Sequence, residues 1–119
     1  MVIGIGNDLI EIERFEKSSD RQGFLERYFT ENELAQAKGR AKMLAADFSV
    51  KESVSKVFGT GIVGFSLDEI EVMREESGRP YVNLYGKALE IARSKGIRRI
   101  HVSITDTQTL VMTVAIGED

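Results

Sequence analysis

The sequence has no cysteine and only one histidine among its 119 residues. Without cysteine the chain can form neither disulfides nor zinc–thiolate sites, and it has no thiol nucleophile, which fits a reducing cytosol. The single histidine, His101, cannot make a multi-histidine metal site, although a catalytic serine–histidine pair stays open. Any bound metal is therefore expected to be a hard ion with oxygen ligands, such as magnesium.

Long apolar runs and an excess of positive charge are also missing. No segment approaches the ~20 apolar residues of a membrane span, and no basic region followed by an apolar stretch marks a signal peptide. With 16 Lys and Arg against 19 Asp and Glu, the net charge of -3 does not favour nucleic acid as a partner. We expect a cytoplasmic protein with a single domain, residues 1–119, and without a membrane or nucleic-acid partner.

The hydrophobic pattern predicts an α+β fold. Expected strands cover residues 2–10, 67–74, 81–84, 99–105 and 109–116. Expected helices cover 12–29, broken near 18–20, then a helix from a capping box at 30–33, a long helix at 40–58 and a last helix at 85–95. Turns at 75–80 and 106–108 indicate hairpins, and hence an antiparallel sheet with helices packed on one face.

The first expected strand carries Gly4, Gly6 and Asp8 on one face, opposite an apolar face. Glycines on one face leave room for the close approach of a ligand or of another backbone, and both interpretations stay open here. A dinucleotide-binding loop is not supported, because a third glycine at the right spacing is missing and no helix opens directly after the second.

The long expected helix places Glu52 nearly opposite its main apolar stripe, beside other apolar residues. A carboxylate on such a face is partly desolvated and needs a cation, a proton or a hydrogen-bond donor. If the first strand packs along this helix, Asp8 and Glu52 can share a magnesium ion, with Lys51 and Lys56 holding phosphates. The alternative is an exposed Glu52–Lys56 pair that stabilises the helix by ~0.3 to 0.5 kcal/mol.

Five segments together resemble the holo-[acyl-carrier-protein] synthases, the short, bacterial-type 4'-phosphopantetheinyl transferases. They are residues 4–10, 48–56, 59–61, 78–81 and 101–105, in the expected order. The resemblance spans essentially the whole chain. Each segment alone is weakly specific, whereas the Gly-x-Asp start combined with the Lys-Glu-x-x-x-Lys helix is highly specific.

The resemblance implies a magnesium-dependent transferase of fatty acid biosynthesis. Such an enzyme moves the 4'-phosphopantetheine arm of coenzyme A onto a serine of apo acyl carrier protein and releases adenosine 3',5'-bisphosphate. Asp8 and Glu52 match the magnesium ligands, and Lys56 matches the lysine near the transferred phosphate. These three residues are the expected catalytic set, with Lys51 as a further phosphate contact and Glu52 or a water held by Asp8 as general base. The small members of the family are homotrimers with active sites between subunits.

Coenzyme A contacts are implied at Gly78, Arg79 and Pro80, near the adenine, and at Ser103 and Asp106. The family usually has a histidine, near the 3'-phosphate, where this chain has Asp106. An aspartate there repels the phosphate unless a cation intervenes, so we expect a weaker hold on the 3'-phosphate. The alternative is that Asp106 only starts the hairpin turn, which aspartate suits.

A basic segment matches the family's docking helix for the acidic carrier protein. It contains Arg14, Lys17, Arg21 and Arg27, so positive charge is local in a chain of net charge -3. Two other classes of function stay open. One is a carrier-protein binding module that has lost catalysis, suggested only by Asp106, and the other is a small α+β ligand-binding domain without chemistry.

Overall fold

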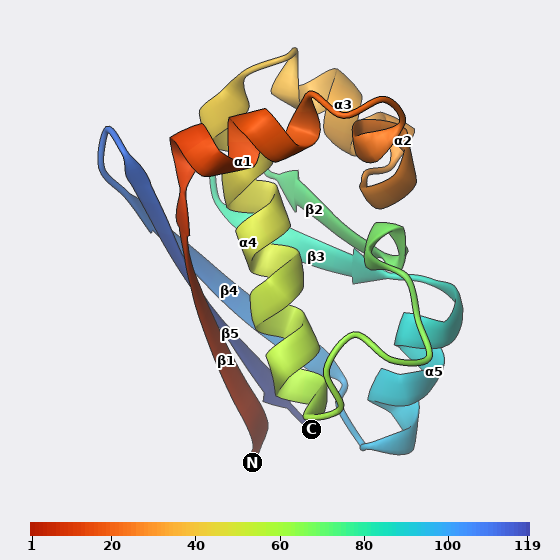
Figure 1. Ribbon diagram of the computed structural model, residues 1–119. Helices are drawn as coiled ribbons and strands as arrows, with labels where there is room; N and C mark the ends of the chain where they lie inside the picture. Colours follow the sequence, from red (N-terminus) through yellow and green to blue (C-terminus); the bar gives the residue numbers. More distant parts are fainter.

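The computed structural model describes residues 1–119 (Figure 1). Its elements, in chain order, are β1 (Val2–Glu11), α1 (Ile12–Ser19), α2 (Phe24–Tyr28), α3 (Glu31–Ala37), α4 (Ala41–Phe58), the 3-10 turn η1 (Leu67–Glu69), β2 (Ile70–Arg74), β3 (Pro80–Leu84), α5 (Gly86–Ser94), β4 (Arg99–Asp106) and β5 (Leu110–Glu118). The predicted α+β architecture with antiparallel strands is confirmed. None of the helices combines the length and hydropathy that a membrane crossing requires.

One predicted strand begins later than expected. Residues 67–69 form the turn η1 instead of the start of β2. The side chain of Glu69 accepts a hydrogen bond from the backbone N–H of Ser66 at 3.0 Å, and this contact closes a tight turn before the chain extends. The predicted capping box of the third helix is confirmed, since Thr30 and Glu33 exchange side chain–backbone hydrogen bonds at 2.9 and 3.2 Å.

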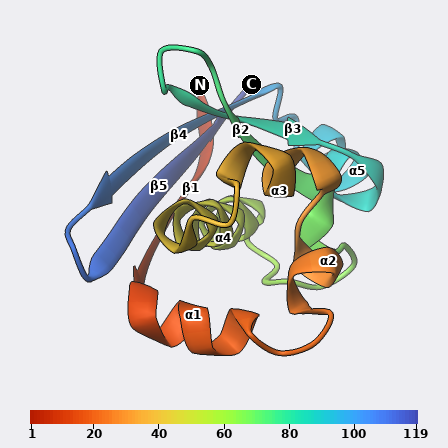
Figure 2. The same cartoon turned by 90° about the horizontal axis from the view of Figure 1, so that it is seen from above.

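The strands form two antiparallel ladders rather than one sheet. A three-stranded sheet has the order β1-β5-β4, and β2 pairs with β3. Figure 2 looks down α4 and shows the three-stranded sheet on one side of this helix and α1 on the other. Apolar clusters cover α4 on both sides, one with β2 and α5 and one with α1 and α3. The predicted helix with two apolar sides is therefore the centre of the fold.

The glycine face of β1 packs against the backbone of α4. A Cβ atom on Gly4 would lie 2.5 Å from the carbonyl oxygen of Val57, and one on Gly6 would collide with that of Ser53. Between the two interpretations left open by the sequence, the structure selects backbone packing. The glycines bring α4 close to β1, which places Asp8 next to this helix.

The opposite face of β1 is apolar and exposed. Ile5 is 65% exposed and Leu9 is 61% exposed, and Met112 on the neighbouring strand is 50% exposed. Monomeric proteins rarely leave large apolar side chains together on one sheet face without a partner. This outer sheet face, defined by Ile5, Leu9 and Met112, bears on the proposed assembly below.

Candidate functional site

The close packing of β1 and α4 brings Asp8 near Glu52. Burial raises the pKa of Glu52, the negative charge of Asp8 raises it further, and the ammonium of Lys56 opposes both effects. A carboxylate that is partly desolvated and repelled by a second carboxylate favours a proton or a cation beside it. The pair therefore has the electrostatic character of a cation site.

Lys56 lies beside Asp8 rather than pairing with Glu52. Its Nζ is 3.9 Å from Asp8 Oδ1, and it donates a 2.6 Å hydrogen bond to the backbone carbonyl of Asn7. The side chain of Lys56 is 54% exposed, whereas that of Asp8 is 15% exposed. The surface Glu52–Lys56 pair that the sequence left open is not among the ion pairs of the structure. Lys56 instead presents its charge to solvent at the edge of the carboxylate pair.

The structure contradicts the prediction that Lys51 contacts phosphate. Lys51 is fully buried, and its Nζ donates to Glu33 Oε1 at 2.9 Å and to the carbonyl oxygens of Leu67 and Ile70 at 3.0 and 2.6 Å. All three ammonium hydrogens therefore have partners inside the protein. Burial lowers the pKa of Lys51 while the carboxylate of Glu33 opposes this shift. The side chain ties α4 to α3 and β2, on a different side of the helix from Glu52.

Three of the predicted coenzyme A residues line one pocket. Gly78, Pro80 and Asp106 surround a cavity of about 390 Å³ whose other lining residues include Arg40, Lys42 and Arg74. Lys42 Nζ is 3.5 Å from Asp106 Oδ1, so a cation does stand beside this carboxylate. Arg74 is paired with the buried Asp47 at 2.6 Å and Lys42 with Asp106, so Arg40 supplies the excess positive charge that favours an anion in this pocket.

Two predicted coenzyme A residues and the carboxylate pair lie elsewhere. Arg79 and Ser103 are exposed and do not line the pocket of Asp106. Neither Asp8 nor Glu52 lines it. Within a single chain the carboxylate pair is therefore not part of the pocket formed by Gly78, Pro80 and Asp106.

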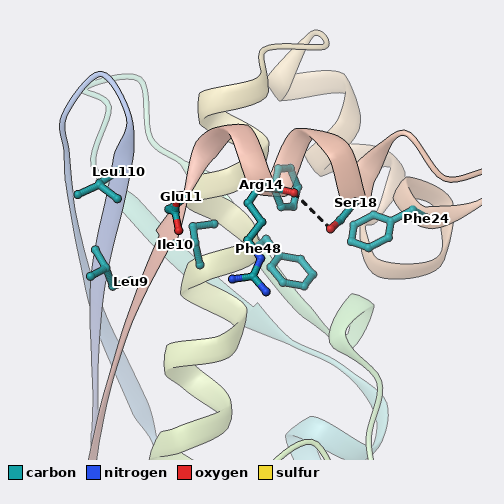
Figure 3. Close-up of a pocket in the computed structure, with 9 residues that line it drawn as sticks. Leu9, Ile10, Glu11, Arg14, Ser18, Phe24, Phe48 and Leu110 are labelled. Atoms are coloured by element: carbon teal, nitrogen blue, oxygen red, sulfur yellow. Dashed lines mark hydrogen bonds between the residues drawn. The ribbon is translucent and has the colours of Figure 1, made fainter.

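The three predicted docking arginines are all exposed. Arg14 is on α1, Arg21 is in the turn after it and Arg27 is on α2. Arg14 also lines a cavity of about 460 Å³ together with Leu9 and Phe48 (Figure 3). Arg27 lines a separate pocket that contains Glu52. Of the three arginines, Arg27 therefore lies in the same pocket as a member of the carboxylate pair, Glu52.

Sequence reasoning missed three hydroxyl residues near Asp8. The side chain of Ser49 donates a 2.8 Å hydrogen bond to Asp8 Oδ2, and it also lies 2.8 Å from the hydroxyl of Thr113. Ser53 is 2.7 Å from the same threonine hydroxyl. The available signal was the spacing of Ser49 and Ser53, which are four residues apart and so share one face of the helix.

Comparison with known proteins places the chain in a family. A sequence model of the 4'-phosphopantetheinyl transferase superfamily matches residues 4–114. The chain therefore belongs to the 4'-phosphopantetheinyl transferase superfamily.

Its similar relatives specify the kind of transferase. It is 47% identical to the holo-[acyl-carrier-protein] synthase of Lachnoclostridium phytofermentans over 99% of this chain and 97% of the relative. It is 50% identical to that of Caldanaerobacter subterraneus over 98% of this chain and 95% of the relative. The resemblance to the holo-[acyl-carrier-protein] synthases inferred from the motifs is confirmed, and by family the chain is a phosphopantetheinyl transferase enzyme.

Solved structures agree with this assignment. The holo-[acyl-carrier-protein] synthase of Neisseria meningitidis is 32% identical, with a TM-score of 0.89 over 100% of both chains. The synthase from Bacillus anthracis, in complex with CoA (3',5'-ADP), is 33% identical, with a TM-score of 0.83 over 100% of this chain and 98% of that chain. The fold class predicted from the sequence is thus that of the family.

Proposed function

We propose that this protein transfers the 4'-phosphopantetheine group of coenzyme A to a serine of apo acyl carrier protein, releasing adenosine 3',5'-bisphosphate, in support of fatty acid biosynthesis. The observation that carries the proposal is the grouping of Asp8, Glu52 and Lys56 in a chain of this family. The same grouping favours a transferase over a binding module without catalysis. The whole chain, residues 1–119, is proposed as the transferase domain, and a cytoplasmic location stays a prediction.

The carboxylate pair fits magnesium as the cofactor. The chain has no cluster of three or more His, Cys, Asp or Glu side chains that would hold an ion by themselves. Magnesium is commonly bound by one or two carboxylates, with water and substrate phosphate oxygens completing its shell. Asp8 and Glu52 are the residues that would hold it, next to the pyrophosphate of coenzyme A. When bound, the ion would stabilise negative charge on that pyrophosphate.

Side chains of this protein can offset the negative charge that the reaction brings together. The attacking serine hydroxyl must approach anionic phosphate oxygens, and the leaving phosphate gains charge as its bond breaks. Lys56, exposed and beside Asp8, is positioned to offer its ammonium to these oxygens. Glu52 is half-buried and provides the second carboxylate of the site, so it can combine the roles of magnesium ligand and proton acceptor. We therefore assign the serine proton to the carboxylate of Glu52.

The nucleotide product offers a direct test of this proposal. Incubation with coenzyme A, magnesium and apo acyl carrier protein should yield adenosine 3',5'-bisphosphate, measured by ion-exchange chromatography. The product should be absent when the carrier protein is left out. Equal release without carrier protein would indicate hydrolysis of coenzyme A and contradict group transfer.

We further propose a homotrimer with active sites between subunits. Two observations support it: the outer sheet face is apolar and exposed, and Asp8 and Glu52 do not line the pocket of Asp106 within a single chain. A neighbouring chain can cover the outer sheet face and bring its own pocket of Asp106 next to the carboxylate pair. Sedimentation equilibrium should give three times the chain mass of 13.3 kDa. A stable monomer that is fully active would contradict this assembly.

The pocket of Asp106 predicts a measurable effect on donor preference. Lys42 pairs with Asp106 and is thereby partly diverted from an incoming 3'-phosphate. Replacing Asp106 by His should raise the preference for coenzyme A over dephospho-coenzyme A about two- to fivefold, the scale of one exposed charge pair. The ratio of the two kcat/KM values measures it, with Glu90→His, on α5, as the control. An unchanged ratio would show that Asp106 does not weaken 3'-phosphate recognition.

The exposed arginines predict a selective effect on the carrier protein. Reversing the charge at Arg14 and Arg21 to Glu should raise KM for acyl carrier protein at least about tenfold and leave KM for coenzyme A nearly unchanged. Added salt should reduce this difference because exposed charges are screened. The matched control reverses the charge of Arg93 on α5 and of Lys95 directly after it. Equal effects on both substrates would argue against α1 and the following turn as the docking surface.

A further inference from the structure

A row of hydrogen-bonded hydroxyl groups lies in the protein interior and ends at Asp8. It consists of Ser49 and Ser53 on α4 and Thr113 on β5, each at most 1% exposed. Ser53 lies 2.7 Å from the hydroxyl of Thr113, Thr113 lies 2.8 Å from that of Ser49, and Ser49 lies 2.8 Å from Asp8 Oδ2. This row of hydroxyl groups therefore ends at one oxygen of a carboxylate that we assign to the cation site.

The fold brings these groups together from three elements. Asp8 and Thr113 are directly opposite in the antiparallel pairing of β1 with β5, so their side chains lie on the same face of the sheet. Ser49 and Ser53 are one helical turn apart and share one face of α4. Gly6 permits α4 to approach β1 closely, since any Cβ at that position would collide with the helix backbone.

Asp8 fixes the direction of the hydrogen bonds that lead to it from Thr113 and Ser49. An ionised carboxylate only accepts, so Ser49 must donate its one hydroxyl hydrogen to Asp8. The contact between Ser49 and Thr113 then requires Thr113 to donate. Having used its hydrogen, Thr113 accepts at its hydroxyl from Ser53, whose hydrogen is shared with the backbone carbonyl of Thr113 at 3.3 Å. The hydroxyl dipoles of Ser49 and Thr113 are thus aligned toward Asp8, an arrangement that strengthens the terminal hydrogen bond.

We propose that Ser49 and Thr113 are positioning residues that orient Asp8 as a metal ligand. Ser49 occupies Asp8 Oδ2, which leaves Oδ1, the oxygen 3.9 Å from Lys56 Nζ, on the open side of the carboxylate. Donors that hold a ligating carboxylate restrict its rotation before the ion arrives, and their loss commonly lowers metal affinity. This inference rests on the proposed magnesium site.

Manganese binding measured by electron paramagnetic resonance tests the inference. Mn²⁺ serves as the probe for the hard-ion site, titrated into the wild-type protein and variants in the presence of saturating coenzyme A. Ser49→Ala should weaken Mn²⁺ binding about 10- to 100-fold, and the near-isosteric Thr113→Val should weaken it by a smaller factor. The control is Ser55→Ala, which removes another buried hydroxyl of α4 whose only partner is the carbonyl of Lys51. It should bind Mn²⁺ within about twofold of wild type.

The outcomes separate this inference from the function on which it rests. Thermal melts followed by circular dichroism establish that each variant is folded at the temperature of the titration. Unchanged Mn²⁺ affinity in folded Ser49→Ala would overturn the positioning role and leave the magnesium proposal standing. If Ser49→Ala does not fold, unchanged affinity in Thr113→Val would overturn it in the same way. A wild-type protein that binds no Mn²⁺ would remove the magnesium site and this inference together.

Discussion

Replacing Glu52 by Gln is expected to lower kcat for phosphopantetheine transfer at least ~100-fold, the scale of removing one group that stabilises charge in the transition state. Glutamine keeps the shape of the side chain but provides neither a negative ligand nor a proton acceptor at neutral pH. Steady-state kinetics with apo acyl carrier protein measure the effect. Glu90→Gln on α5 changes the same charge at an exposed position away from the site and should retain normal turnover.

The same substitution should leave the fold intact. Because burial and Asp8 raise the pKa of Glu52, the folded state favours its protonated form, and the stability associated with this proton is lost as the pH rises through the folded pKa. A neutral glutamine avoids that loss, so the free energy of unfolding at pH 8 should be unchanged or slightly higher. Near-normal turnover in a folded Glu52→Gln protein would show that Glu52 is only a helix residue.

The second large effect concerns Lys51 and stability. Replacing Lys51 by Met should lower the free energy of unfolding by about 3 to 5 kcal/mol, because it leaves the buried carboxylate of Glu33 without its cation. Two carbonyl groups, those of Leu67 and Ile70, also lose their donor. Urea unfolding at equal protein concentration measures the change. The double variant Lys51→Met with Glu33→Gln should recover much of the loss, since it removes the unpaired charge.

The pH dependence of this variant has a defined sign. Burial already raises the pKa of Glu33 while Lys51 opposes that shift, so removing Lys51 raises the pKa further. The folded state then holds a proton that the unfolded chain gives up, and the associated stability is present at low pH and lost as pH rises. The deficit relative to wild type should therefore be smaller at pH 5 than at pH 8. A folded variant that loses turnover without losing stability would restore Lys51 as a phosphate contact.

The secondary structure was accessible from the sequence because its signals are local. The helical spacing of apolar residues and the capping residues predicted the helices. The capping box of Thr30 and Glu33 appears in the structure as predicted. The start of β2 was missed because a side chain–backbone contact of Glu69 overrides alternation at residues 67–69. The division into two ladders depends on strand partners far apart in the chain, which alternation does not specify.

The site was accessible in part. Asp8 and Glu52 were brought together by reasoning from a glycine face and a second helix face, and the structure does place β1 along α4. The predicted phosphate contact of Lys51 is wrong because the position of a residue on a helix does not show which element covers its side chain. In the structure α3 covers Lys51, and Glu33 accepts its hydrogen bond. Ser49 and Thr113 became visible only with the β1–β5 register and the approach of α4.

Mass spectrometry of apo acyl carrier protein tests the central claim most directly. After incubation with coenzyme A, magnesium and the wild-type protein, the carrier protein should gain the mass of a single 4'-phosphopantetheine group on a serine. The gain should disappear when a chelator removes the metal and should be strongly reduced with Glu52→Gln. A carrier protein that stays unmodified by the folded wild-type enzyme would contradict the assignment of Asp8, Glu52 and Lys56 as a transferase site.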